Sequence, residues 1–166
     1  MKRILAAVSL TSLVLTGCSS PSPTASQTST PKQYVTAPLT GVRYEAGTPD
    51  ALGLSRASVA CKIDNSEAAR PQIGLNSTDL VFDEMVEGGL TRFVAIWQSH
   101  LPEAVGPVRS IRPMDPDILT PFGGIVCYSG GQAVFVNMMR STPLFNASET
   151  TEQGKGTFTR VHDREA

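Results

Sequence analysis

The stretch Thr91-Arg92-Phe93-Val94-Ala95-Ile96-Trp97-Gln98 decides the fold of this chain. Phe93, Ala95 and Trp97 alternate with Val94 and Ile96, so a strand over these residues would be apolar on both of its faces. A strand with two apolar faces lies inside a sheet that is covered on both sides. We therefore expect residues 91–98 to form a central strand of a globular domain.

Further strands are expected on either side of this one in the sequence. Strand-like runs cover Ala57 to Asp64, Leu80 to Val86, Ile125 to Tyr128 and Thr157 to Val161. The pair Gly88-Gly89 separates the second of these runs from the central strand so tightly that the two should form an antiparallel hairpin.

Short helices are expected between the later strands. Asp115-Pro116 places a capping side chain before proline at the first helical position, and Pro121 ends this helix early. Ser129-Gly130-Gly131 then turns into a helix over about Gln132 to Arg140. The expected fold class is α/β in the broad sense, a mixed α+β domain with a central mixed sheet, short helices and long Gly/Pro loops.

The N-terminus predicts export and lipid anchoring. Lys2 and Arg3 precede the apolar run Ile4 to Leu15, which is too short to span a membrane, and Leu15-Thr16-Gly17 leads directly to Cys18. This pattern is typical of a lipoprotein signal peptide over residues 1–17, with Cys18 receiving a diacylglyceryl group. The expected location is the cell membrane, on its extracytoplasmic face. The alternative is an ordinary signal peptide followed by a chance cysteine.

A tether is expected to follow the anchor. Ser19 to Pro31 consists almost wholly of Ser, Thr and Pro, which cannot bury enough apolar surface to offset the entropy of ordering. We expect residues 18–40 to be a disordered tether and residues 41–166 to form the domain. Because the chain stops just after an expected strand, we expect this domain to be the N-terminal part of a longer protein.

Composition argues against a nucleic-acid partner. The formal net charge is −1, and removal of Lys2 and Arg3 with the signal takes it to −3, without a basic stripe anywhere. Cys61 and Cys127 form an even pair once Cys18 is acylated, in a compartment that permits disulfides. They could be bridged if their strands are neighbours, or they could be two buried thiols.

Five sequence blocks occur in an order and spacing that resemble one family. They are Lys62-Ile63-Asp64-Asn65-Ser66, Ala69-Arg70-Pro71-Gln72-Ile73-Gly74-Leu75, Val86-Glu87-Gly88-Gly89-Leu90-Thr91-Arg92-Phe93, Val105-Gly106-Pro107-Val108-Arg109-Ser110 and Tyr128-Ser129-Gly130-Gly131. Over residues 57–164 the chain resembles the YerB family of bacterial lipoproteins, whose function is unknown. The resemblance implies a YerB-like N-terminal domain followed in relatives by a Pro-His-Asn-Leu-like segment and a second domain. Tyr128 stands where relatives often carry histidine.

Charged residues near the ends of the expected strands are the candidate ligand-binding groups. Arginine forks suit bidentate capture of carboxylates or phosphates, and nearby carboxylates could pair with them instead. The glycine turn after residue 128 could cap the following helix or hold an anion at its N-terminus. The structural alternative for all of these residues is an internal network of salt bridges and loop-fixing hydrogen bonds. The candidates are Asp64, Asn65, Arg70, Glu87, Arg92, Arg109, Arg112, Ser129 and Gly130.

Patterns of known catalytic sites are largely missing from the sequence. His100 and His162 lie far apart without metal-ligand spacing, and Ser129 lacks the G-x-S-x-G context of a nucleophile. Asp83 and Glu84 point to opposite faces of one strand, so they cannot act as a catalytic pair. We expect no metal and no cofactor. The sequence favours a lipoprotein that binds an anionic cell-wall polymer or an envelope protein. The alternatives are a wall-acting enzyme completed by a missing C-terminal half and a purely structural tether.

Overall fold

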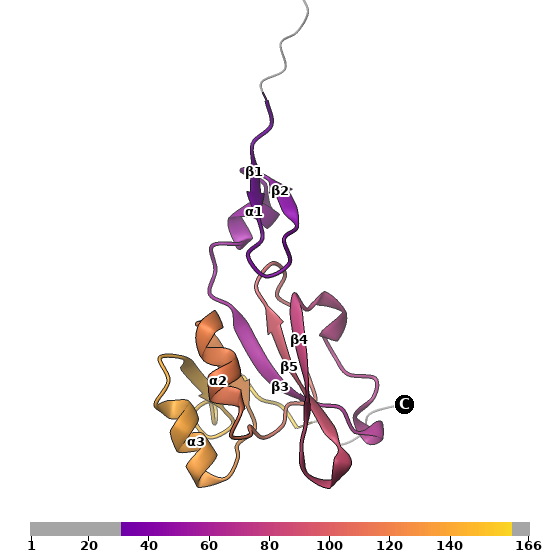
Figure 1. Cartoon of the computed structure of the whole chain (residues 1–166), viewed down its shortest axis with the longest axis vertical. Coiled ribbons are helices and arrows are strands. Elements are labelled where there is room, and N and C mark those ends of the chain that lie inside the picture. Colours follow the sequence, from indigo (N-terminus) through magenta and orange to yellow (C-terminus); the bar gives the residue numbers. More distant parts are fainter. Residues whose placement is uncertain (1–30, 161–166) are drawn as a thin grey trace, which may run out of the picture. The chain divides into compact units, whose positions relative to one another are not determined.

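The computed structural model describes residues 31–160 and contains a five-stranded mixed sheet in the order β4-β5-β3-β6-β7 (Figure 1). Strand β3 pairs antiparallel with β5 and parallel with β6, β4 pairs antiparallel with β5, and β6 pairs parallel with β7. The expected mixed α+β class with a central mixed sheet is confirmed. The strands are β3 (Val59–Asp64), β4 (Leu80–Met85), β5 (Thr91–Trp97), β6 (Ile125–Tyr128) and β7 (Phe145–Ser148).

Strand β5 lies inside the sheet and is buried from Val94 to Trp97, as its two apolar faces predict. Val94 and Ile96 pack on one face with Leu119 of α2 and Met139 of α3. Figure 1 shows α2 and α3 side by side along the sheet. The other face is covered by loop residues, chiefly Leu75, Val105 and Val108, which pack against Trp97 and its neighbours. Burial of each large apolar side chain stabilises the fold by about 1.5–3 kcal/mol.

The turn between β4 and β5 forms the expected antiparallel hairpin. A short 3₁₀ turn, η3 (Glu87–Gly89), joins Met85 to Thr91, which are paired in the ladder. Gly88 and Gly89 have φ values of 73° and 72°, a left-handed conformation that glycine adopts without a Cβ clash. The two glycines therefore permit the tight reversal.

The helices are short, and none among residues 31–160 is long and apolar enough to cross a membrane. Helix α3 (Ala133–Arg140) lies where the sequence predicts it. Helix α2 (Asp115–Leu119) runs into the 3₁₀ turn η4 (Thr120–Phe122). The expected capping role of Asp115 is wrong, because its carboxylate accepts hydrogen bonds from Lys62 and from the Arg112 N–H instead of from the first helical turn. Two further 3₁₀ turns, η1 (Glu67–Ala69) and η2 (Leu75–Ser77), follow β3.

A small hairpin precedes the main sheet. Strand β1 (Tyr34–Thr36) pairs antiparallel with β2 (Arg43–Glu45), and helix α1 (Pro49–Gly53) follows with Thr48 as its N-cap. Strand β1 falls inside residues 18–40, which the sequence predicts to be a disordered tether. Residues before 31, including Cys18 and the signal region, lie outside the described residues.

The C-terminal part differs from expectation in two places. Strand β7 was not expected, and it forms because Phe145–Ser148 finds a parallel neighbour in β6. Conversely, residues 157–160 of the expected last strand form no strand, and Val161 lies outside the described residues. Strand propensity alone does not form a strand without a neighbouring backbone to pair with.

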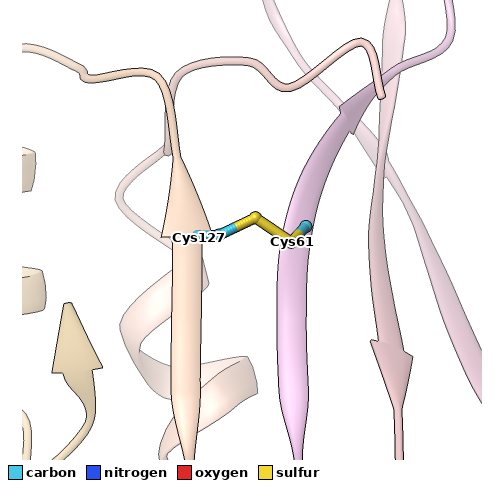
Figure 2. The surroundings of a disulfide bond; sticks show 2 residues. All are labelled: Cys61 and Cys127. Carbon is cyan, nitrogen blue, oxygen red and sulfur yellow. A yellow bond between two sulfur atoms is a disulfide. The ribbon is translucent and has the colours of Figure 1, made fainter. Parts of the chain in front are cut away.

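A disulfide joins the two parallel strands β3 and β6. Cys61 and Cys127 are directly opposite in the register, with their Cα atoms 4.5 Å apart, and Figure 2 shows the bond bridging the two strands. It closes a segment with a sequence separation of 66 residues. Restricting a loop of that length in the unfolded chain stabilises the fold by about 4 kcal/mol in the chain-entropy description.

Candidate functional site

Strands β3 and β6 separate just beyond the disulfide, and another segment enters between them. The parallel register ends at Cys61 and Cys127. Past this point the backbone of Arg109 donates to Lys62 O (2.8 Å) on one side and accepts from Ser129 N (3.1 Å) on the other. We call this arrangement the fork: the ends of β3 and β6 with residues 107–111 between them. It places Arg109 at the carboxyl ends of parallel strands, the position where open sheets commonly bind ligands.

A cleft of about 750 Å³ opens at the fork, within the size range of ligand sites. Asp64 and Ser129 line it from the ends of β3 and β6, and Arg109 lines it from between them. Glu149 and Glu152, which follow β7, add two further carboxylates and Arg160 adds a second guanidinium, whereas Ile73, Val105 and Val108 supply apolar wall. The fork thus brings three of the residues predicted from sequence into one cleft.

The ion pair between Arg109 and Asp64 is the central polar contact of this cleft. Arg109 Nε donates to Asp64 Oδ2 at 2.6 Å; the Asp64 side chain is 8% exposed and that of Arg109 is 54% exposed. Burial works to raise the pKa of Asp64. The Ser66 N–H and Arg109 outweigh it and hold that pKa below its usual range. Asp64 is therefore a fixed carboxylate, and Arg109 has donors that remain open to solvent.

A row of charged side chains crosses three strands beside the fork. Arg92 on β5 lies opposite Glu84 on β4 and opposite Asp64 on β3 in the ladder. Its Nη1 donates to the carbonyl of Ser110 at 2.9 Å. Burial lowers the pKa of Arg92, and the neighbouring guanidiniums of Arg112 and Arg109 lower it further, whereas the carboxylates of Asp64 and Glu87 act in the opposite direction. Arg92 is thus a partly buried cation with two other cations close to it.

Arg112 and Glu87 form a second ion pair near Arg92. Arg112 Nη2 lies 2.7 Å from Glu87 Oε2, and Glu87 is largely exposed at the β4–β5 turn. The hydrogen bond from Arg112 lowers the pKa of Glu87. Arg92, Arg109 and Arg112, hereafter the arginine cluster, therefore face two partnered carboxylates, Asp64 and Glu87.

The remaining candidates have local structural roles. Arg70 Nη2 donates to Asn65 O and Asn65 Oδ1, both at 3.2 Å, and Gln72 Nε2 reaches the same Oδ1 at 3.1 Å. These bonds fix the loop after β3, and Asn65, Arg70 and Gln72 themselves are not part of the cleft lining. The Gly130 carbonyl accepts from the N–H of Ile111 (3.0 Å), which ties down the end of β6.

A buried charged triad beneath the arginine cluster was not found from the sequence. Lys62 Nζ donates to Glu84 Oε2 and to Asp115 Oδ1 (2.7 Å for the latter), and the side chains of all three are at most 6% exposed. Among residues 31–160, none forms a hydrogen bond with Glu84 Oε1. Burial raises the pKa of Glu84 to about 7, and the nearby Asp115 carboxylate contributes in the same direction despite the opposing effect of Lys62. The sequence feature that could have indicated the triad is Lys62, a charged residue within the otherwise apolar first part of β3.

No set of three His, Cys, Asp or Glu side chains within residues 31–160 is arranged to hold a metal ion. Ser129 lines the cleft together with Arg109 and Arg160. The cleft is charged and contains the ion pair between Arg109 and Asp64.

Comparisons of sequence and of structure with known proteins both find YerB of Bacillus subtilis as a relative. A protein of Bacillus subtilis (strain 168) named "Putative lipoprotein YerB" is 42% identical over 94 residues, which cover 57% of this chain and 27% of that protein. The crystal structure of YerB protein from Bacillus subtilis matches with a TM-score of 0.64 and 34% identity, over 72% of this chain and 40% of that chain. The chain therefore spans well under half the length of these relatives.

The match to a family model covers more of this chain than the match to either relative. Residues 39–166 match the N-terminal domain of a family described as a protein of unknown function (DUF3048). This range contains the sheet, the fork and the arginine cluster. The chain belongs to the DUF3048 family and carries its N-terminal, YerB-like domain.

Proposed function

We propose that this protein is a lipid-anchored extracytoplasmic lipoprotein whose domain binds an anionic group of a cell-wall polymer or an envelope protein. The arginine cluster at the fork is the proposed binding element. Wall peptides carry free carboxylates and wall polymers carry phosphates, and arginine binds both through paired hydrogen bonds.

The observation that carries the binding proposal is that the Arg92 guanidinium has neighbouring cations but no ion-pair partner among residues 31–160. Among residues 31–160, no carboxylate lies within ion-pair distance of its guanidinium, whereas Arg112 and Arg109 crowd it. A partly buried cation with two other cations close to it is stabilised when an anion binds beside it. Three guanidiniums against two carboxylates leave the cluster with net positive charge.

The anchoring proposal rests on the sequence of the N-terminus and on the relatives. Leu15-Thr16-Gly17-Cys18 has the order of a lipoprotein cleavage site, and a relative is named a putative lipoprotein. The Cys61–Cys127 disulfide supports an extracytoplasmic location, because disulfides persist in oxidising compartments. Two acyl chains on Cys18 would hold the protein stably on the membrane.

The binding proposal is tested with Arg109→Ala, titrated with an uncrosslinked wall peptide and with poly(glycerol phosphate). Loss of a hydrogen bond to a charged group should weaken binding of one of these ligands by about 10- to 150-fold, or 1.5–3 kcal/mol. Stability should change by about 1 kcal/mol or less, because Arg109 is half exposed. Arg70→Ala, outside the cleft lining, is the control. A loss of about 3–5 kcal/mol in stability with no ligand effect would instead establish an internal structural tie.

The anchoring proposal is tested by labelling. In a bacterial host grown with radioactive palmitate, the wild type should be labelled and fractionate with membranes, and Cys18→Ala should lose the label. An unlabelled wild type found free in the medium would overturn the assignment.

A further inference from the structure

We propose that the ligand of the cleft is a short peptide bearing both a free carboxylate and a free ammonium group, held between Arg109 and Glu149. This inference rests on the proposed anion-binding function and names the chemistry of its ligand. Arg109 and Glu149 lie on either side of β6, and the cleft that they line carries charges of both signs.

Backbone hydrogen bonds fix the separation of the two backbones that carry these charges. Ser129 N donates to Arg109 O (3.1 Å) on one side of the end of β6, and Glu149 N donates to Tyr128 O (3.2 Å) on the other side. Arg109 and Glu149 therefore occupy the two backbones that flank β6. Neighbouring strands are about 4.8 Å apart, so these two backbones are separated by roughly 10 Å. Three residues of extended peptide span about the same distance, at about 3.3 Å per residue.

The charges of the cleft match a ligand with both signs. Its lining includes the carboxylates of Asp64, Glu149 and Glu152 together with the guanidiniums of Arg109 and Arg160. A polyanion would meet three carboxylates, and a polycation would meet Arg109. A ligand with separated carboxylate and ammonium groups can place each opposite its counter-charge.

The partners that Glu149 has in the free protein can be exchanged for a ligand. Glu149 pairs with Arg160 at 2.5 Å, and the two side chains are 41% and 76% exposed. Exposed ion pairs contribute about 1 kcal/mol or less, so a ligand ammonium can displace Arg160 at little loss. Ile73, Val105 and Val108 form apolar wall that can pack against small side chains between the two ends of the peptide.

The test compares three forms of one peptide by NMR titration of the full chain. Trialanine carries both charges, N-acetyl-trialanine carries only the carboxylate, and trialanine amide carries only the ammonium. Trialanine should bind at least fivefold more tightly than either blocked form. Glu149→Gln should remove most of this advantage over N-acetyl-trialanine. Glu45→Gln is the matched control, because Glu45 is 44% exposed and pairs with exposed Lys32 at 2.7 Å.

The outcomes separate this inference from the function on which it rests. Equal binding of trialanine and N-acetyl-trialanine would overturn the two-charge ligand and leave anion binding intact. Binding of poly(glycerol phosphate) with no binding of trialanine at 10 mM would also overturn it and identify a polymeric anion. If the wall peptide and the polymer both fail to bind as well, anion binding itself is refuted.

Discussion

Replacing Glu84 with glutamine should change how the stability of the domain depends on pH. Glu84 is buried at the Lys62–Glu84–Asp115 triad, and its pKa is raised from 4.5 to about 7 in the folded state. Between these values the folded protein holds a proton that the unfolded chain releases. The unfolded state then binds fewer protons, so stability falls as pH rises from about 4.5 to about 7.

The size of the effect follows from the shift. One pKa unit corresponds to about 1.36 kcal/mol, so the loss across this window is about 3 kcal/mol as an order of magnitude. A glutamine side chain at this position would be neutral throughout and could still accept from Lys62. The Glu84→Gln protein should therefore lose the slope and become the more stable form above pH 7. The pKa values of Asp64 and Glu87 are lowered from ordinary values of 3.8 and 4.5, so both groups act on stability below the pH range of the assay.

Denaturant unfolding at pH 5, 6, 7 and 8 measures this slope. Trp97 is the single tryptophan and is fully buried, so its fluorescence reports loss of the sheet. Asp83→Asn is the matched control, since Asp83 is the exposed neighbour of Glu84 on the opposite face of β4. A constant difference in unfolding free energy between wild type and Glu84→Gln over this pH range would refute the reasoning.

Three further changes test the framework of the site. Lys62→Met should lower stability by about 3–5 kcal/mol, because it leaves two buried carboxyl groups without a cation. Adding Glu84→Gln to this variant should restore part of the loss. A loss below about 1 kcal/mol for Lys62→Met alone would contradict the role of Lys62 as the central cation of the triad. The double change Cys61→Ala and Cys127→Ala should lower stability by about 4 kcal/mol. A thiol assay on unfolded Cys18→Ala protein should find neither cysteine free, and two free thiols would disprove the bond. Thr48→Ala should lower the free energy of unfolding by about 0.5–2 kcal/mol, since the Thr48 hydroxyl accepts a hydrogen bond from Ala51 N in the first turn of α1 at 3.3 Å. An unchanged melting temperature would show that this cap does not stabilise the domain.

The sequence predicts the elements whose own residues determine their structure. Strand β5 is apolar on both faces, and the glycine pair before it has left-handed φ values, so both the strand and its hairpin follow from local pattern. Helix α3 follows the glycine turn after β6, where the sequence predicts it. In these cases local preference and tertiary position agree.

The elements that depend on a distant partner are harder to predict. Strand β7 is short and contains Asn146 and Ser148, and it is a strand because β6 offers a parallel edge. Residues 157–160 carry a strand-like alternation but find no such neighbour among the described residues, and they form no strand. Strand β1 consists of strand-forming residues, but it is only three residues long, and its pairing with β2 lies beyond the Ser/Thr/Pro-rich segment that precedes it.

The same distinction applies to the site. The sequence selects Asp64 and Arg109 by residue type and position at element ends, but the 2.6 Å contact between them depends on the fork. Asp115 has the sequence context of a helix cap, yet its carboxylate turns to Lys62 because a buried ammonium needs a counter-charge. The residues around Asp115 do not indicate this contact, because Lys62 lies 53 positions away in the sequence.

The disulfide sits at the vertex of the fork, where β3 and β6 part. Cys61 and Cys127 are the last paired residues before the strands diverge. If only hydrogen bonds joined the two strands, their separation beyond residues 61 and 127 could extend along the ladder by breaking one residue pair after another. The covalent bond prevents the separation from passing Cys61 and Cys127. The bond therefore keeps β3 and β6 together up to the point where residues 107–111 enter between them.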